Sequence, residues 1–290
     1  MNIKATNLQL FYGRDQVLHD IDFEINEPQI YGLLGRNGAG KTSLLSILGS
    51  FREPTAGELL VNGKEPFENA EMMQQVTFMY NKDYTGETES PSNIIKDINR
   101  YRPNFDLEYA EELLNKFKLK DKKALSKLST GKQSAFNVVV GLASRSPITI
   151  FDEVYLGMDA PARDIFYKEL LKEQEDYPRI MILSTHLVSE MDYLFDEVII
   201  IDEGKLLLHE SYDDLVSRGV TVVGNKQAVD TFAQDKEVLN EEQLGDTRSI
   251  TLYGALSETD KDSAKELGLS IGPVSLQDLF IQLTKEEDES

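Results

Sequence analysis

The 290-residue sequence has no cysteine, no tryptophan and no apolar run approaching the roughly 20 residues that a membrane-spanning helix needs. The lack of cysteine excludes disulfide frameworks, thiol nucleophiles and cysteine metal sites, and it suits a reducing compartment. The first residues, Met1–Asn7, lack the apolar core of a signal peptide, and we expect a soluble chain.

Basic residues are also scarce. The sequence has 30 Lys and Arg against 51 Asp and Glu, which gives a formal net charge of −21. Free binding to nucleic acid or to anionic lipid depends on a positive surface that attracts phosphate. We therefore expect no nucleic-acid partner, and we expect any attachment to a membrane to run through another protein.

A glycine-rich segment lies between a short apolar run, residues 30–34, and a helical pattern, residues 43–48. Backbone N–H groups at such a strand-to-helix turn can point inward and bind phosphate together with the helix N-terminus. The lysine of this motif reaches the outer phosphates, and the hydroxyl after it ligates Mg²⁺. A glycine-rich turn without a ligand is the alternative. The predicted nucleotide-binding residues here are Gly35, Arg36, Asn37, Gly38, Ala39, Gly40, Lys41, Thr42 and Ser43.

The order of the predicted elements indicates an α/β fold. Alternating strands within residues 1–28 predict an antiparallel β layer, and apolar spacings of three and four predict a helical subdomain at about 83–147. Alternating strands and helices then favour a mostly parallel sheet around the phosphate loop. We predict two domains: a nucleotide-binding domain over 1–218 and a small α+β accessory domain over 219–290.

Three further segments carry candidate chemistry. The apolar run Ile148–Phe151 ends in Asp152 and Glu153, and strand alternation would direct these carboxylates to opposite sides, one for Mg²⁺ and one to orient water. Leu128–Gln133 is a Ser/Gly turn that opens a helix, and it is either a second anion site or a plain helix cap. His186 follows another apolar strand, where an imidazole can contact a phosphate. Each signal is weak alone, since carboxylates at strand ends are common.

Taken in order along the chain, these segments resemble the motifs of ATP-binding-cassette (ABC) ATPase subunits over about residues 1–215. The resemblance implies that two subunits face head to tail, with each ATP between the phosphate loop of one chain and Ser129 and Gly131 of the other. A single copy of each motif implies that the chain must pair. It would form a homodimer, or a heterodimer with a second cassette subunit.

The same resemblance implies roles for individual residues. Tyr12 matches the aromatic residue that stacks on adenine. Thr42 and Asp152 match the ligands of Mg²⁺, while Glu153 matches the catalytic carboxylate and His186 the switch histidine. ATP and Mg²⁺ are the cofactors implied, and hydrolysis of ATP is the expected activity.

The chain departs from the family pattern in places. Asn81 stands where a glutamine is usual, Thr130 where a glycine is usual, Lys132 where a glutamine is usual, and Val154 where a proline is common. Asn81 has about 1.5 Å less reach, one C–C bond, so it can contact Mg²⁺ or the attacking water only if the backbone moves closer or a water bridges. We therefore keep Asn81 as a candidate catalytic residue and possible Mg²⁺ ligand, with a tolerated substitution as the alternative.

The terminal segment Ser275–Thr284 resembles the tails of cassette subunits from bacterial multidrug, bacteriocin and peptide exporters, although a plain amphipathic helix is the alternative. We expect an ATPase subunit that drives drug or peptide export through a separate integral membrane subunit, peripheral on the cytoplasmic face of the membrane. More narrowly, the length and motifs resemble ATPase subunits of staphylococcal phenol-soluble modulin exporters. A soluble cassette with a non-transport partner, or a degenerate cassette that barely hydrolyses ATP, are the alternatives. The transported substrate is chosen by the membrane subunit and cannot be read from this chain.

Overall fold

The computed structural model describes residues 1–120, 122–236, 238–254 and 256–284. The chain forms two compact units. The first comprises Met1–His186 with Ile201–Leu206, and the second comprises Leu187–Ile200 with Leu207–Ser290. The domain boundary expected after residue 218 stays a prediction.

The first unit contains the predicted antiparallel β layer. Its three strands are β1 (Ile3–Tyr12), β2 (Asp15–Ile25) and β4 (Ala56–Val61), in the order β2-β1-β4. Both pairings of β1 are antiparallel. Buried and exposed residues alternate along the first half of β1 and the second half of β2, as expected for a sheet that faces the core on one side.

The central sheet has six strands in the order β5-β6-β7-β3-β8-β9. Its four strands from β5 to β3 pair in parallel, and every residue of β3, β6 and β7 is buried, which is typical of strands covered on both faces. Ligands of such sheets bind beyond the carboxyl ends of the strands, where the candidate residues are. The strands are β3 (Ile30–Leu34), β5 (Val76–Tyr80), β6 (Ile148–Asp152), β7 (Ile180–Thr185), β8 (Glu197–Asp202) and β9 (Lys205–Ser211).

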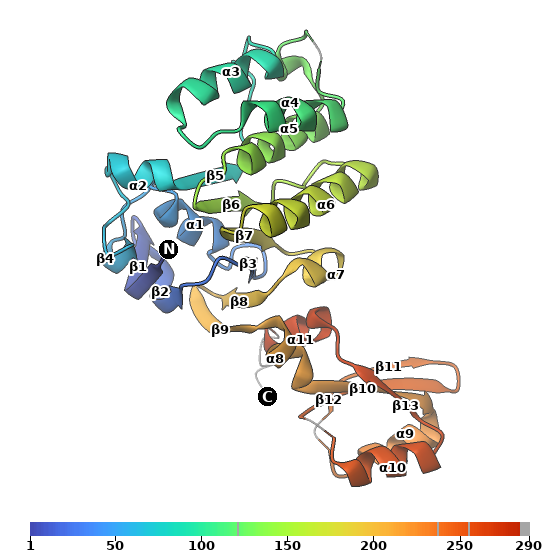
Figure 1. Ribbon diagram of the computed structural model, residues 1–290. Coiled ribbons are helices and arrows are strands. Elements are labelled where there is room, and N and C mark those ends of the chain that lie inside the picture. The colour runs from blue at the N-terminus through green and yellow to red at the C-terminus, as the bar shows by residue number, and fades with distance from the viewer. Residues whose placement is uncertain (121, 237, 255, 285–290) are drawn as a thin grey trace. The chain divides into compact units, whose positions relative to one another are not determined.

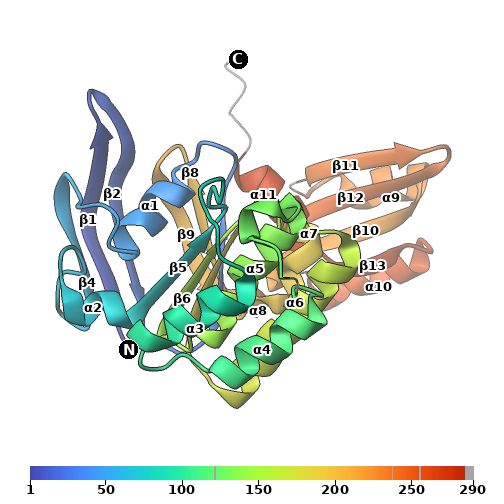
Figure 2. The ribbon, with the colours of Figure 1, turned by 90° about the horizontal axis from the view of Figure 1, so that it is seen from above.

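Helices α1 (Lys41–Leu48), α2 (Ala70–Gln75) and α6 (Ala160–Asp176) accompany this sheet. The helical insertion consists of α3 (Pro91–Tyr101), α4 (Leu107–Lys116), the 3₁₀ turn Leu125–Lys127 and α5 (Thr130–Ala143). Helices α3, α4 and α5 gather beside β5 in both views of the ribbon (Figures 1 and 2). Aspartate caps fix where two helices begin, because Asp106 accepts from the N–H of Tyr109 and Asp159 from that of Ala162, each at 2.9 Å.

The second unit contains a four-stranded antiparallel sheet in the order β11-β12-β10-β13. Val222, Ile250 and Leu252 of this sheet form a core with residues of α9 and α10, which lie on one side of it in Figure 1. Helix α11 packs against α7 and α8 within the same unit. The elements are α7 (Val188–Met191), the 3₁₀ turn Asp192–Leu194, α8 (Tyr212–Ser217), β10 (Gly219–Asn225), α9 (Lys226–Ala233), β11 (Val238–Leu244), β12 (Thr247–Tyr253), α10 (Glu258–Glu266), β13 (Ser270–Pro273) and α11 (Leu276–Leu283).

The fold class predicted from the sequence is confirmed in its main parts: a parallel α/β core, an antiparallel β layer, a helical insertion and a small C-terminal α+β region. Strand β11 was not expected, because its residues from Glu241 to Leu244 are all exposed at a sheet edge and show no apolar alternation. No helix in the described part of the chain combines the length and the apolar character needed to cross a membrane.

A buried ionic cluster joins α6 to the start of β7 and the end of α5. Glu173 and Arg179 are 3% and 5% exposed, and their charged groups lie 3.1 Å apart. Arg145 adds a second cation, 3.2 Å from Glu173. Removing one partner of such a pair leaves an uncompensated buried charge, so the cluster is a sensitive point of the core.

We therefore expect Glu173→Gln to lower the free energy of unfolding by about 3 kcal/mol, measured by urea denaturation of the full chain. The matched control is Asp164→Asn on the same helix. Asp164 forms an exposed pair with Lys168, and its loss should change stability by less than about 0.5 kcal/mol. Equal effects of the two substitutions would show that the buried cluster contributes no more than a surface pair.

Candidate active site

The phosphate loop connects β3 to α1 and has the backbone that its glycines permit. Gly38 and Gly40 have φ values of 87° and 102°, a region that other residues rarely adopt. A Cβ at Gly40 would also lie 2.9 Å from Leu18, and one at Gly35 would lie 2.5 Å from the carbonyl oxygen of Ile201. The close packing and the left-handed turns together account for all three glycines of the loop.

Lys41 is the buried cation of this loop, with 6% of its surface exposed. Its Nζ donates to the carbonyl of Gly35 at 2.7 Å and to that of Arg36 at 3.2 Å, so the side chain folds back over the loop. Burial lowers the pKa of Lys41, and the nearby carboxylates of Glu153 and Asp152 oppose that shift. The ammonium group is thus held where outer phosphates would meet it.

Thr42 and Asp152 come together although they are 110 residues apart. The Thr42 hydroxyl donates to Oδ2 of Asp152 at 2.7 Å, and the Ser184 hydroxyl donates to Oδ1 at 2.5 Å. A hydroxyl and a carboxylate that converge beside a phosphate site suit Mg²⁺, which takes one or two protein oxygens together with phosphate oxygens. The donor set of Thr42 and Asp152 therefore fits the predicted ion.

Glu153 turns out of the strand at a φ of 50°, a left-handed conformation rather than the continued alternation expected from the sequence. Its Oε1 lies 2.8 Å from Nδ1 of His186 and 3.8 Å from Nζ of Lys41. The predicted carboxylate and the predicted histidine thus contact each other directly. Hydrogen bonding of this kind orients a carboxylate that acts as a base.

A cavity of about 520 Å³ joins these groups to the edge of the antiparallel layer. Tyr12 is 42% exposed there, its hydroxyl lies 3.4 Å from Ser43, and the guanidinium of Arg52 lies 4.4 Å above its ring. Within the loop, Gly35 and Ala39 are buried and Arg36 is exposed. The cavity is lined by Tyr12, Val17, Asn37, Gly38, Gly40, Lys41, Thr42, Ser43 and Glu153.

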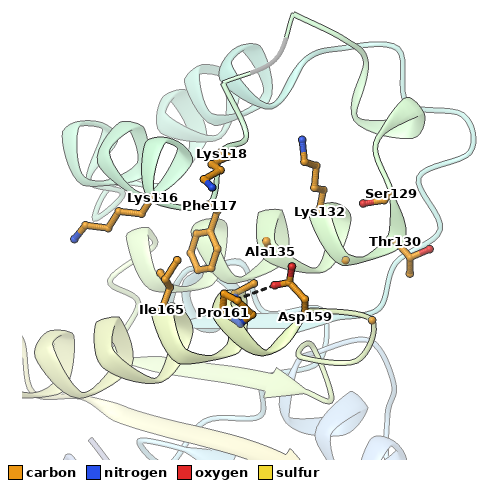
Figure 3. A pocket seen from close by; sticks show the side chains of 13 residues that line it. Lys116, Phe117, Lys118, Ser129, Thr130, Lys132, Ala135, Asp159, Pro161 and Ile165 are labelled. Atoms are coloured by element: carbon orange, nitrogen blue, oxygen red, sulfur yellow. Dashed lines mark hydrogen bonds between the residues drawn. The ribbon is translucent and has the colours of Figure 1, made fainter.

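Ser129 and Gly131 lie in a second pocket, of about 530 Å³, which shares no lining residue with the first (Figure 3). Ser129 occupies the N-cap position of α5, but its side chain makes no capping hydrogen bond. The choice between an anion site and a plain helix cap stays a prediction. The backbone of Gly157 explains Gly131, since a Cβ there would lie 2.3 Å from the Gly157 carbonyl oxygen. In Figure 3, Lys132 rises from the first turn of the same helix.

Asn81 follows β5, and both the nitrogen and the oxygen of its side-chain amide form hydrogen bonds. Nδ2 donates to the carbonyl of Glu153 at 3.0 Å, and Oδ1 lies 3.3 Å from the hydroxyl of Ser134. The structure thus places Asn81 against the backbone of the candidate base. Its contact with Mg²⁺ or water stays a prediction.

Sequence reasoning missed two features of these sites. The first is Ser184, which the sequence marks only as a residue of the apolar strand before His186. Its hydroxyl donates to Asp152, and this contact depends on the pairing of β6 with β7. The second pocket, which holds Ser129 and Gly131, is rimmed by lysines from residues 116–132, a segment with seven lysines in an otherwise acidic chain. A local charge count would have found this second feature, which the net charge of −21 concealed.

The parallel sheet, the phosphate loop and the carboxylates beyond its strands define an ATPase of the phosphate-loop class. The family model described as ABC transporter matches residues 18–155. An uncharacterized ABC transporter ATP-binding protein of Methanocaldococcus jannaschii, MJ1023, is 31% identical over 73% of this chain and 79% of its own. The chain therefore belongs to the family of ABC transporter ATP-binding proteins, and it is an ABC transporter ATPase.

Other relatives extend over almost the whole chain. The ABC transporter ATP-binding protein YtrB of Bacillus subtilis is 24% identical over 96% of this chain and 97% of its own. The bacitracin transport ATP-binding protein BcrA of Bacillus licheniformis is 27% identical over 97% of this chain and 96% of its own. These matches include the C-terminal region as well as the cassette.

Solved structures share the fold of the cassette. The ATP-binding subunit of an ABC transporter is 21% identical, with a TM-score of 0.67 over 74% of this chain and 92% of that one. The ATP-binding cassette MJ0796, in a dimeric post-hydrolysis state with ADP and Pi, gives a TM-score of 0.63 at 20% identity, over 72% of this chain and 98% of that one.

We expect Lys41→Ala to weaken ATP binding by about 100-fold or more, because a buried charge-assisted contact to phosphate is lost. Isothermal titration calorimetry measures the affinity directly. The control is Lys64→Ala, which removes an exposed lysine paired with Glu71 and should leave the affinity unchanged. Undiminished affinity in a folded Lys41→Ala protein would contradict the assignment of the phosphate loop.

Proposed function

We propose that the chain is the ATPase subunit of an exporter, and that it hydrolyses ATP between two cassettes that face head to tail. One observation carries the pairing: the phosphate loop and Ser129 with Gly131 line separate pockets of a single chain. If both groups act on one nucleotide, they must come from two chains. The partner is a second copy or a second cassette subunit.

Within each site, Lys41 and the loop amides bind the phosphates, and Tyr12 stacks on the adenine. Arg52 lies over the Tyr12 ring, so the base would take the other face. Thr42 and Asp152 would hold Mg²⁺, which supplies positive charge to the phosphates when bound. Glu153 accepts the proton of the attacking water, and His186 holds its carboxylate in place.

A role in transport is supported by BcrA, whose name gives bacitracin transport and whose length this chain covers almost fully. Export as the direction of transport rests on the resemblance of the terminal segment Ser275–Thr284 to exporter subunits. We propose an amphipathic peptide or drug as cargo. The narrower proposal of phenol-soluble modulin export rests on the sequence resemblance alone. A separate integral membrane subunit, to which the cassette binds on the cytoplasmic side, would choose that cargo.

The membrane partner has its own test. We expect the chain to copurify from detergent-solubilised membranes with a protein of several predicted membrane spans, and the complex to show ATP hydrolysis stimulated by an amphipathic peptide. Recovery of the chain with a soluble partner only would favour the alternative of a cassette machine outside transport.

The catalytic proposal predicts that Glu153→Gln keeps ATP affinity but lowers hydrolysis by about 10²- to 10⁴-fold, since the amide cannot accept the proton of water. ATP-bound dimers should accumulate, which light scattering with and without ATP can detect. Glu190→Gln, on a four-residue helix outside both pockets, is the control. Monomers only, in a variant that binds ATP, would argue against pairing of the isolated subunit, and intrinsically slow wild-type hydrolysis would favour the degenerate cassette.

A further inference from the structure

Helix α5, which begins within the Ser/Gly turn Leu128–Gln133, carries two buried polar side chains on its inner part. Ser134 and Asn137 lie one turn apart and are 2% and 3% exposed. Every residue from Ser134 to Ala143 is buried, so these two groups are set within the packed part of the helix. Buried polar groups are costly unless they are hydrogen-bonded, so their partners indicate what they do.

Ser134 connects α5 to the turn that begins with Glu153. Its hydroxyl donates to the carbonyl of Leu156 at 2.8 Å and lies 3.3 Å from Oδ1 of Asn81, so one hydrogen is shared between two acceptors. Nδ2 of Asn81 donates in turn to the carbonyl of Glu153 at 3.0 Å. The same carbonyl accepts the N–H of Leu156 at 3.1 Å, so both ends of the turn 153–156 are tied to α5.

Asn137 holds the loop that carries Asn81. Its Nδ2 donates to the carbonyl of Tyr80 at 2.9 Å, and its Oδ1 accepts from the hydroxyl of Tyr84 at 2.5 Å. Burial, with smaller contributions from Tyr80 and Glu87, raises the pKa of Tyr84 to about 12, so the phenol remains a donor at neutral pH. The loop 80–84 is therefore fastened to α5 at each end, with Asn81 between.

We propose that Ser134 is a positioning residue for Glu153 and acts through Asn81 and the turn 153–156. The φ of 50° at Glu153 is one that residues other than glycine seldom adopt, so neighbouring contacts must hold it. The backbone conformation of Glu153 sets the direction of the carboxylate toward His186 and Lys41. Because Ser129 is the N-cap of α5, one helix links the pocket at Ser129 and Gly131 to the candidate base Glu153 in the same chain.

The experiment is steady-state ATP hydrolysis by the full chain. We expect Ser134→Ala to lower kcat about fivefold to twentyfold, the range for loss of one well-placed hydrogen bond, with the KM for ATP within about twofold of wild type because the phosphate loop is untouched. Ser134→Thr keeps the hydroxyl and should recover most of the rate. If Ser134→Ala does not fold, Asn81→Ala removes the same link from an exposed loop and should give the same loss.

The matched control is Ser144→Ala at the other end of α5. Ser144 is also 2% exposed and its hydroxyl donates to the carbonyl of Gly141, but it contacts neither the loop nor the turn. We expect its kcat to equal that of wild type. A rate for Ser134→Ala equal to that for Ser144→Ala would overturn the inference.

A second measurement separates positioning from general loosening of the core. The inference rests on the proposed role of Glu153, so Ser134→Ala should add no further loss in a Glu153→Gln background, and the Asn81→Ala/Ser134→Ala pair should be no slower than the slower single variant. The same proportional loss in the Glu153→Gln background would overturn the link. Full hydrolysis by Glu153→Gln alone would instead remove the role of Glu153, a result that is distinguishable from failure of Ser134.

Discussion

The site depends on one hydrogen bond between distant parts of the chain, from the hydroxyl of Thr42 to Oδ2 of Asp152. It joins the first turn of α1 to the end of β6, and Ser184 at the end of β7 completes the hold on the same carboxylate. These contacts are possible because β3, β6 and β7 are parallel, buried and aligned, so that their carboxyl ends meet at one edge. The sheet is thus the scaffold, and the carboxylate of Asp152 is the point where three strands and the phosphate loop converge.

Glu153 directly follows Asp152 at the carboxyl end of β6 but contacts a different set of side chains. Strand geometry would carry it to the far side of β6, but its left-handed φ turns the chain and brings Oε1 to His186. Asp152 therefore stays with the hydroxyls of Thr42 and Ser184, and Glu153 contacts the imidazole of His186 and Lys41. The two adjacent carboxylates have different hydrogen-bond partners because the backbone changes direction at Glu153.

Much of this arrangement could be predicted from the sequence because the motifs are local. The phosphate loop, the pair Asp152–Glu153 and His186 each follow an apolar run, and the alternation of strands and helices places those runs in one sheet. The hydrogen bonds from Ser134 to Asn81 and from Asn81 to the backbone carbonyl of Glu153 could not be predicted, because they join residues that are 53 and 72 positions apart and no local pattern marks them. The exposed edge strand β11 was missed for another reason, since its polar residues give no alternation.

The net charge of −21 also has to be reconciled with the proposal that two chains pair around a polyanion. At physiological ionic strength charges are screened over about 8 Å, so repulsion between two chains depends on the surfaces that meet rather than on the totals. The pocket at Ser129 and Gly131 is rimmed by Lys116, Lys118 and Lys132, whereas acidic residues dominate elsewhere. Lys116 is already paired with Glu112 and Glu169, so Lys118 and Lys132 are the cations of this rim that carry no ion pair in the described part of the chain. Asp159 is the one acidic residue among those that line this pocket, so Lys118 and Lys132 leave it with a positive balance. The acidic total of the chain therefore does not oppose the approach of this face to a nucleotide.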